Sequence, residues 1–500
     1  MKDFEFKAHL DKALLPSDSR IRDSIEDENL PNNGDYCKAT TLILVVLFVC
    51  GILAFGISVV VWHFYDIEND VWVPHTSTME TIGIVVVLLL CGILALGLPA
   101  AVWRYYEKLE SEPNSPRIGS QFPTADPVVA HIANSAPPVY EKRIIGYYTE
   151  FESRDITKQQ LSKLTHAVFA YVEMTVTGGL QFRNDNSKNR FLILRKKAKS
   201  CGSDVKVMIS IGGYENSQHF ASVTADSEKK SVFINSIDSF LREHKIDGVD
   251  FYWKDATGDD KGNYIAFIRE LHEKLNDKKH YLISLTIPPP SISNWEFAYD
   301  LEESLEDVDF FNVYSMDYQG PWDNQWGTPA GPIAALYSTT EGRKQFSVDA
   351  TMKFYVCKTK KPSKFNIVIP FFARLWRHVK GPLEHGKEVI RDAELRDNKA
   401  VGNAYMSRWT VNDQKFNLTP ATWDEETKSS YIFDSQRKTY LTFEDEKSIA
   451  AKVDYVNRMN LGGVWIWTVE MDDDQNSLLD LVSTKQLCST KSGINVNHQC

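Results

Sequence analysis

The segment "IDGVDFYWKDA", residues 246–256, carries the pattern on which the fold prediction rests. Its central part, 248–253, is a short apolar run of the length and composition typical of a buried β-strand. Residues two apart on a strand point to the same face, so Asp250, Tyr252 and Lys254 are expected to share one face. The segment therefore predicts a strand that presents polar groups near its carboxyl end.

Strand-like segments of the same kind recur along the C-terminal two thirds of the chain. Amphipathic segments lie between them; in residues 228–242, for example, Phe233, Ile237 and Leu241 share one helical face. Eight strand-then-helix units over residues 143–487 predict a (β/α)8 barrel, whose reactive groups come from the C-terminal ends of its strands. The predicted strands are residues 143–148, 167–172, 205–211, 248–253, 281–287, 310–314, 366–371 and 464–468.

The interval after the seventh predicted strand is too long for a single helix. It includes strand-like pieces such as "YIFDSQRKTYLTF", residues 431–443. We expect residues of about 372–445 to form a small α+β insertion between strand seven and helix seven, walling one side of the cleft.

The N-terminal part of the chain has a different composition. Residues 1–38 are polar and charged and predict a disordered tail. Residues 39–62 and 81–103 are uncharged and long enough to cross a bilayer, and they repeat one another at an offset of 41 ("CGILAFGISVVVW" and "CGILALGLPAAVW"). A pair of buried core helices is the alternative. A loop at 63–80, a Pro- and Ser-rich linker at 104–142 and a tail at 488–500 complete the organisation.

Composition and charge narrow the classes of ligand. A net charge of −11 and a pI near 5.6, with no dense basic stretch, argue against nucleic acid as a partner. The sequence has no CxxC pair and no His-rich cluster, so no metal site and no cofactor are expected. Four cysteines could form disulfides if the domain lies outside the cytosol, namely Cys201, Cys357, Cys488 and Cys500.

Several motifs, in order, resemble those of glycoside hydrolase family 18, the chitinases and chitinase-like lectins. The resemblance covers residues 143–487, and the membrane-anchored arrangement looks most like nematode-type chitinase-like proteins. It rests on "RIIGYYTEF", "LTHAVFAYVEM", "KVMISIGGYEN" with an SxGG signature, "DGVDFYWK" against DGxDxDxE, "FFNVYSMDYQGPW", "IPFFARLW" and "LGGVWIWTVEMDDD".

The resemblance implies a substrate-assisted mechanism, in which the sugar's own acetamide attacks the anomeric carbon and the enzyme supplies a proton. The family uses the last Glu of its signature as that acid and the preceding Asp to orient the acetamide. Here Lys254 stands at the position of the acid and Tyr252 at that of the orienting Asp. A lysine, with a side-chain pKa of ~10.4, is a poor acid at neutral pH. Its positive charge is also the wrong sign for a cationic transition state.

The sixth-strand motif departs from the family as well. The family's MxYD is "YSMD" here, so Met316 replaces the tyrosine that hydrogen-bonds the acetamide, and only Asp317 is kept. Asp255 is not expected to substitute as the acid, because strand alternation would turn it away. A buried Lys254 requires a partner, and we expect an internal ion pair with Asp250, Asp317 or both.

Other positions match the sugar-binding residues of the family. Chitin-type sugars stack on aromatic rings, and a few polar groups fix their orientation. Packing in the barrel core is the alternative role for Tyr147 and Tyr171. The predicted glycan-binding residues are Tyr147, Tyr171, Tyr214, Asp250, Asp317, Arg374 and Trp467.

The sequence therefore predicts a membrane-anchored chitinase-like protein that has lost catalysis and binds a glycan, or a protein partner, in its cleft. There are two alternatives: an active hydrolase that uses a non-standard acid, and a scaffold that binds no glycan. Loop charges favour two spans with both ends cytoplasmic. If only one segment spans, the barrel lies in the lumen or outside the cell, which is the side that the family resemblance favours. The sequon at Asn417 is a candidate glycosylation site that would decide between them.

Overall fold

The computed structural model describes residues 142–277, 279–290, 297–414 and 416–485, together with 65–66, 71–72, 487, 498 and 500. The chain divides into two compact units, 1–129 and 130–500. In the first, β1 (Tyr65–Asp66) pairs antiparallel with β2 (Val71–Trp72). The predicted N-terminal tail, the membrane segments and residues 104–141 of the predicted linker lie outside the described residues. Within the described part of the chain, no helix combines the length and apolar character needed to cross a bilayer.

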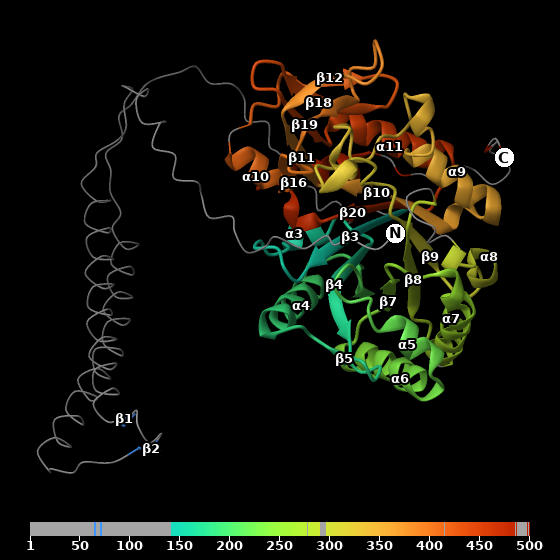
Figure 1. Cartoon of the computed structure of the whole chain (residues 1–500). Coiled ribbons are helices and arrows are strands. Elements are labelled where there is room, and N and C mark those ends of the chain that lie inside the picture. The colour runs from blue at the N-terminus through green and yellow to red at the C-terminus, as the bar shows by residue number, and fades with distance from the viewer. Residues whose placement is uncertain are drawn as a thin grey trace, which may run out of the picture. The chain divides into compact units, whose positions relative to one another are not determined.

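Eight parallel strands of the second unit close into a barrel (Figure 1). Each strand pairs in parallel with its two neighbours, and the pairing of β3 with β4 closes the ring. The predicted (β/α)8 barrel is confirmed. Its strands are β3 (Arg143–Thr149), β4 (His166–Met174), β6 (Lys206–Gly212), β7 (Gly248–Tyr252), β8 (Leu282–Ile287), β9 (Phe310–Val313), β10 (Phe365–Pro370) and β20 (Gly463–Trp467).

Helices cover the outside of the barrel, because each strand is followed by a segment with one apolar face. In α6 (Ser227–His244), Phe233, Ile237 and Leu241 are buried, as the helical pattern predicts, and Asp226 caps the N-terminus. The other helices of the barrel are α3 (Lys158–Leu161), α4 (Asp185–Ala198), α5 (Phe220–Ala225), α7 (Lys261–Asn276), α8 (Leu301–Ser304), α9 (Val348–Thr359), α11 (Glu446–Arg458) and α12 (Ser477–Thr484).

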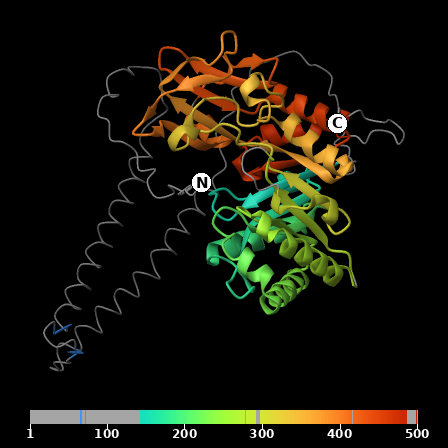
Figure 2. The ribbon, with the colours of Figure 1, turned by 45° about the vertical axis from the view of Figure 1, so that its right-hand side comes forward.

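An antiparallel sheet lies between β10 and α11, where the sequence predicts an insertion. Its strand order is β16-β11-β19-β18-β17, and it stands on one side of the barrel in both ribbon views (Figures 1 and 2). Buried side chains on its two faces form separate small cores. The elements are β11 (Phe372–Arg377), β16 (Gly402–Ser407), α10 (Arg408–Asp413), β17 (Thr422–Asp424), β18 (Ser429–Asp434) and β19 (Thr439–Phe443), with the small ribbons β12 (Val379–Pro382) to β13 (Arg391–Ala393) and β14 (Leu395–Arg396) to β15 (Lys399–Ala400).

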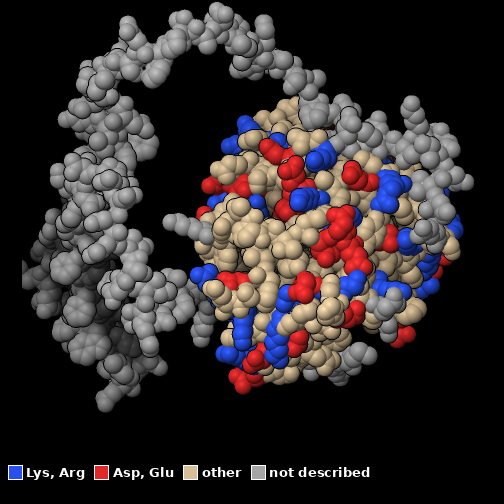
Figure 3. Space-filling model, turned by 90° about the horizontal axis from the view of Figure 1, so that it is seen from above, with Lys and Arg blue, Asp and Glu red and all other residues tan. Residues whose placement is uncertain are grey.

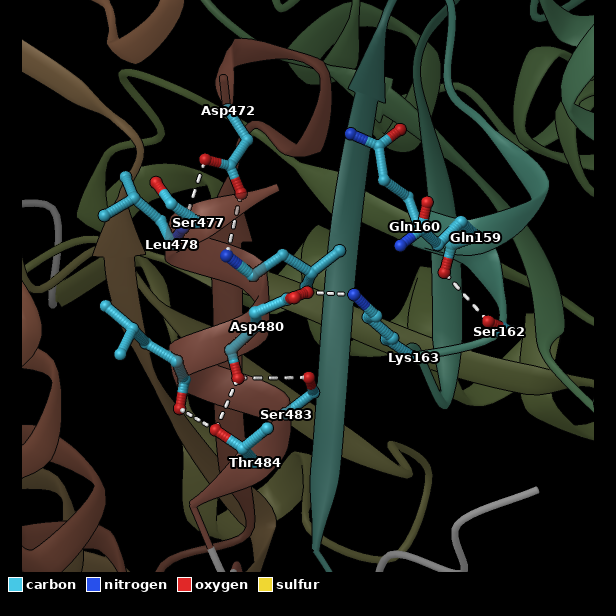
Figure 4. A network of polar contacts seen from close by, with 12 residues as sticks. Gln159, Gln160, Ser162, Lys163, Asp472, Ser477, Leu478, Asp480, Ser483 and Thr484 are labelled. Atoms are coloured by element: carbon cyan, nitrogen blue, oxygen red, sulfur yellow. Dashed lines mark hydrogen bonds and ion pairs between the residues drawn. The ribbon is translucent and has the colours of Figure 1, made fainter. Parts of the chain in front are cut away.

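The last helix is attached to the barrel by the acidic run that follows β20. The Asp472 carboxylate accepts hydrogen bonds from the backbone N–H groups of Leu478, at 3.1 Å, and Leu479, at 2.8 Å (Figure 4). Burial raises the pKa of Asp472 to about 6. On the same helix Asp480 pairs with Lys163. These contacts bind α12 to the ends of β20 and α3, so part of the "EMDDD" motif has a structural role.

Cys357, on α9, forms a disulfide with Cys500, and the two Cα atoms are 5.4 Å apart. The bond attaches the C-terminal residue to the barrel. Cys201 is a free thiol, and Cys488 lies outside the described residues. Of the four cysteines predicted as candidates, one pair is therefore bonded.

Lysine and arginine side chains are interspersed with acidic side chains on the face seen in Figure 3. A duplex or single strand of nucleic acid requires a continuous basic surface to neutralise its phosphates. The mixed charge of this face agrees with the net charge of −11.

Candidate active site

A buried polar network fills the interior of the barrel around Asp250, on β7. Asp250 has no exposed surface, and burial raises the pKa of its carboxyl group. It accepts hydrogen bonds of 2.7 Å from both Ser210 and Ser284, and one of 3.1 Å from Thr286. These hydroxyl groups satisfy the carboxylate within the barrel. Asp250 therefore supports the site from below and does not line an open surface.

Tyr147 belongs to the same network. Its hydroxyl lies 3.0 Å from Thr286 Oγ1 and accepts a 2.9 Å hydrogen bond from Asn312. The side chain is 2% exposed, and its ring lies 5.1 Å from that of Trp465. The structure thus places Tyr147 in the core, the alternative role that the sequence left open.

Lys254 lies just beyond the end of β7, and its ammonium group is covered. The side chain is 7% exposed, and its Nζ is 2.6 Å from Asp255 Oδ2. The predicted internal ion pair exists, but the predicted partners, Asp250 and Asp317, were wrong. The strand ends at Tyr252, and Asp255 has a left-handed backbone with φ of 64°. This turn brings the carboxylate back to the lysine, whereas a continuing strand would have directed it away.

Tyr252 and Tyr314 occupy the space between the ends of β7 and β9. Their rings stack with centroids 5.9 Å apart, and burial raises the pKa of both hydroxyl groups. Tyr252 is 5% exposed, and Met316 is fully buried. Positions 252 and 316, which depart from the family motifs, are therefore filled by side chains that carry no acidic group.

Asp317 is held by two other residues of the site. Its Oδ1 accepts a 2.6 Å hydrogen bond from Arg374, on β11, and its Oδ2 a 2.6 Å bond from the Tyr314 hydroxyl. Arg374 also donates to the backbone oxygen of Gln319 and lies over the ring of Trp322. Because both carboxylate oxygens are engaged by charged or phenolic donors, Asp317 is fixed in orientation.

An aromatic group forms the floor beside this network. Trp467, at the end of β20, is half-buried, and its ring lies 6.3 Å from Tyr171 and 6.3 Å from Trp465. Tyr171 is 7% exposed. Gly213, from the SxGG signature, has φ of 87°, and a Cβ there would lie 2.6 Å from the Tyr171 ring. Glycine is required at this position because the tyrosine ring occupies the space of a side chain.

Tyr214 is the most accessible of the predicted glycan-binding residues. It is 48% exposed, and its ring lies 4.9 Å from the Lys254 ammonium. Its neighbour Glu215 lines a hollow of about 500 Å³ together with Glu173 and Arg183, at the carboxyl ends of β4 and β6. Tyr214 and Trp467 are thus the rings most available for stacking.

Four residues of the site were not predicted as binding candidates. Trp465 contacts Tyr147 and Trp467, Trp322 contacts Arg374, and Tyr405 packs on Phe372 at 4.9 Å. Glu470 follows Trp467; it is 2% exposed, and burial raises its pKa to about 7. Its Oε1 accepts from the Thr149 hydroxyl at 2.6 Å, while Oε2 has no hydrogen-bond partner among the described groups. The eighth-strand motif "LGGVWIWTVEMDDD" contains both Trp465 and Glu470. The sequence pattern of this motif does not indicate which of its carboxylates is buried.

The sequon residue Asn417 lies in an exposed loop of the insertion, and its Oδ1 accepts a 3.0 Å bond from the Thr419 N–H. The side chain is therefore sterically accessible to modification. Its glycosylation stays a prediction, as do the glycan contacts of the residues above.

The model of glycosyl hydrolases family 18 matches residues 143–472. Among curated proteins, the chain is 25% identical over 307 residues to chitinase A1 of Niallia circulans and 24% identical over 380 residues to probable chitinase 2 of Drosophila melanogaster. These matches cover 57% and 70% of the chain, and 42% and 76% of the relatives. The chain thus spans less than half of the bacterial relative.

Solved structures share the fold. A family 18 N-acetylglucosaminidase from Paenibacillus barengoltzii superimposes with a TM-score of 0.58 at 24% identity, over 68% of this chain and 99% of that one. The Ostrinia furnacalis group IV chitinase in complex with allosamidin gives 0.59 at 20%, over 69% and 98%. YKL-39, solved in the presence of chitooligosaccharides, gives 0.59 at 20%, over 70% and 100%.

The family match covers well over half of the chain and coincides with the barrel that carries the site. The chain belongs to glycosyl hydrolases family 18.

Proposed function

We propose that this protein binds a chitin-type or related glycan in the barrel cleft without hydrolysing it. The observation that carries the proposal is the covered Lys254 ammonium, 2.6 Å from Asp255, at the position that matches the family's acid. A glycosidase requires a proton donor at the leaving oxygen, and an ammonium group held by a carboxylate is a poor one. Its positive charge also opposes the charge that develops on the sugar.

The packing around Tyr252 supports the loss of substrate-assisted chemistry. That mechanism requires the acetamide to be oriented against the anomeric carbon. Here the orienting position holds a neutral phenol stacked on Tyr314, and Met316 is buried without a polar group to offer. The Tyr314 hydroxyl is engaged by Asp317. The groups that would receive the acetamide are therefore absent or used internally.

Retained binding is supported by the accessible rings of Tyr214 and Trp467. Aromatic rings with a few polar groups are the common construction of sugar sites. YKL-39 was solved in the presence of chitooligosaccharides. By analogy we assign a chitooligosaccharide as the first ligand to test, with a protein partner as the alternative occupant of the cleft.

The anchoring of the barrel is part of the proposal. Anchoring is supported by the two uncharged segments at 39–62 and 81–103, which are long enough to cross a bilayer, and the family resemblance favours the extracellular or lumenal side for the barrel. Protease protection of the barrel in sealed membrane vesicles tests the side. Digestion from the cytoplasmic face would contradict it.

The function is tested by pairing a binding assay with a turnover assay. The full-length chain is titrated with chitotetraose by calorimetry and incubated with a chromogenic chitooligosaccharide. We expect binding that Trp467→Ala weakens about tenfold, the usual effect of truncating an aromatic anchor, and no turnover. Phe354→Ala, which removes an exposed ring on α9, is the matched control. Turnover by the parent chain would contradict the proposal.

Hydrolysis with a non-standard acid is the second candidate function. The Glu470 carboxyl group lies three residues after Trp467, its Oε2 has no hydrogen-bond partner among the described groups, and burial raises its pKa to about 7. The side chain has no exposed surface, so this acid would act only if the site opens. If turnover is detected, Glu470→Gln abolishes it under this alternative, whereas Asp255→Asn leaves it intact. Loss of turnover in the Asp255 variant alone would instead assign the acid to Asp255.

A further inference from the structure

A second groove, separate from the barrel cleft, lies where three distant segments meet. Tyr337 belongs to the connection between β9 and α9, Trp423 to β17 of the insertion, and the third wall is α11. The backbone N–H groups of Leu336 and Tyr337 both donate to the carbonyl oxygen of Thr427, at 3.0 and 3.4 Å. These bonds attach the connection to the turn that follows Trp423. The groove is therefore a built feature of the fold.

The face of α11 that lines the groove has a specific composition. Lys447, Ala450, Ala451, Asp454 and Arg458 follow the spacing of one helical face. The two alanines are small, so they leave a recess between the longer charged residues on either side. The opposite face of the helix packs into the barrel.

Aromatic side chains form the walls of this recess. Trp423 and Tyr337 are both half-buried. The Trp423 Nε1 donates to Glu425 at 2.6 Å, and the Lys447 ammonium lies 6.0 Å from the indole ring. Arg458 donates to the Tyr337 hydroxyl at 2.7 Å. Both rings are thus held in place by charged partners before any ligand arrives, which lowers the entropic cost of binding.

We propose that this groove is a second glycan-binding site, for a short neutral oligosaccharide. Its volume of about 560 Å³ is within the range of small-molecule sites. Carbohydrates present apolar C–H faces to rings and hydroxyl groups to charged side chains, and the groove offers both. Its lining carries three cations (Lys428, Lys447 and Arg458) and two carboxylates (Glu425 and Asp454), so it has no strong field of one sign. This site is independent of the proposed function of the barrel cleft.

The test is calorimetric titration of the full-length chain with chitotetraose, using variants of each site. We expect two binding sites in the parent chain. Trp423→Ala removes one of them, and Ala450→Leu, which fills the recess from a half-buried position on α11, removes the same one. Trp467→Ala weakens binding at the other site about tenfold. Phe354→Ala, on α9, retains both and is the matched aromatic control.

The outcomes separate this inference from the function proposed for the cleft. A single site that requires Trp467 and tolerates both groove variants overturns the second site and leaves cleft binding intact. A single site that requires Trp423 supports the groove and overturns cleft binding. The absence of binding in the parent chain overturns both.

Discussion

From the ion pair between Lys254 and Asp255 we predict that replacing either residue changes the stability of the protein by a different amount. The Lys254 side chain is 7% exposed and that of Asp255 is 62% exposed. Replacing Asp255 by Asn removes the charge of the accessible partner, so the covered Lys254 ammonium loses this carboxylate. Asparagine also tolerates the left-handed backbone at this position, so the substitution isolates the charge.

The loss of unfolding free energy expected for Asp255→Asn lies between two limits. An exposed ion pair contributes about 0–1 kcal/mol, whereas removing one partner of a fully buried pair costs about 3–5 kcal/mol. Because Asp255 is mostly exposed, we expect Asp255→Asn to lower the free energy of unfolding by about 1–2 kcal/mol. For a domain of this size, a loss of about 1–2 kcal/mol lowers the melting temperature by about 1–3 °C.

Lys254→Met should behave differently. It removes the covered charge and keeps an apolar stem of similar length, while the remaining carboxylate is accessible to water. We expect a change within about 0.5 kcal/mol, since replacing a buried charge by an apolar group is often neutral or stabilising. The double variant, Lys254→Met with Asp255→Asn, should have the same stability as Lys254→Met alone. Once the ammonium group is gone, the carboxylate of Asp255 has no charge to neutralise.

Urea and thermal unfolding of the full-length chain measure these differences. Asp204→Asn is the matched control, because it breaks a Lys–Asp pair in which the aspartate is 93% exposed. It should leave the melting temperature unchanged. The reasoning is refuted if Lys254→Met destabilises more than Asp255→Asn, or if Asp255→Asn cannot be distinguished from the control.

Three further predictions concern catalysis, pH and redox state. Lys254→Glu alone should not create turnover of a chromogenic chitooligosaccharide, because the acetamide still lacks its orienting partners; measurable turnover contradicts this. Burial raises the pKa of Glu470 from 4.5 to about 7, so the folded chain holds the proton more tightly. Stability should therefore fall as the pH rises from about 4.5 to about 7, and Glu470→Gln should flatten this part of a melting profile; an unchanged slope sinks the assignment. Cys500→Ser should lower the melting temperature by releasing a loop closed over 143 residues from Cys357, whereas Cys201→Ser should not; equal effects count against the disulfide.

The strands of the barrel were predictable because each is a short apolar run followed by an amphipathic segment. Parallel strands are buried on both faces, and this produces nearly continuous hydrophobic sequences. The residues at which the strands end were harder to predict. β7 ends at Tyr252, one residue before the predicted end, because the chain turns at a left-handed Asp255 that no residue pattern announces.

The site was predictable in its chemistry and less so in its geometry. The replacement of the acid by Lys254 can be read directly, because the motif fixes the position of each residue. The burial of Asp250 and Tyr147 could not be read, since strand alternation does not distinguish the interior of a barrel from its mouth. The stacking of Tyr252 on Tyr314 joins two strands 62 residues apart in sequence.

The sequence by itself determined the barrel and the absence of the expected acid, because hydrophobic periodicity and motif order are local properties of the chain. Tertiary structure alone decided the partner of Lys254, the pairing of Cys357 with Cys500, and the groove between Tyr337, Trp423 and α11. Each of these depends on the approach in space of groups whose separation is set by turns and by closure of the sheet. The local sequence pattern does not determine those distances.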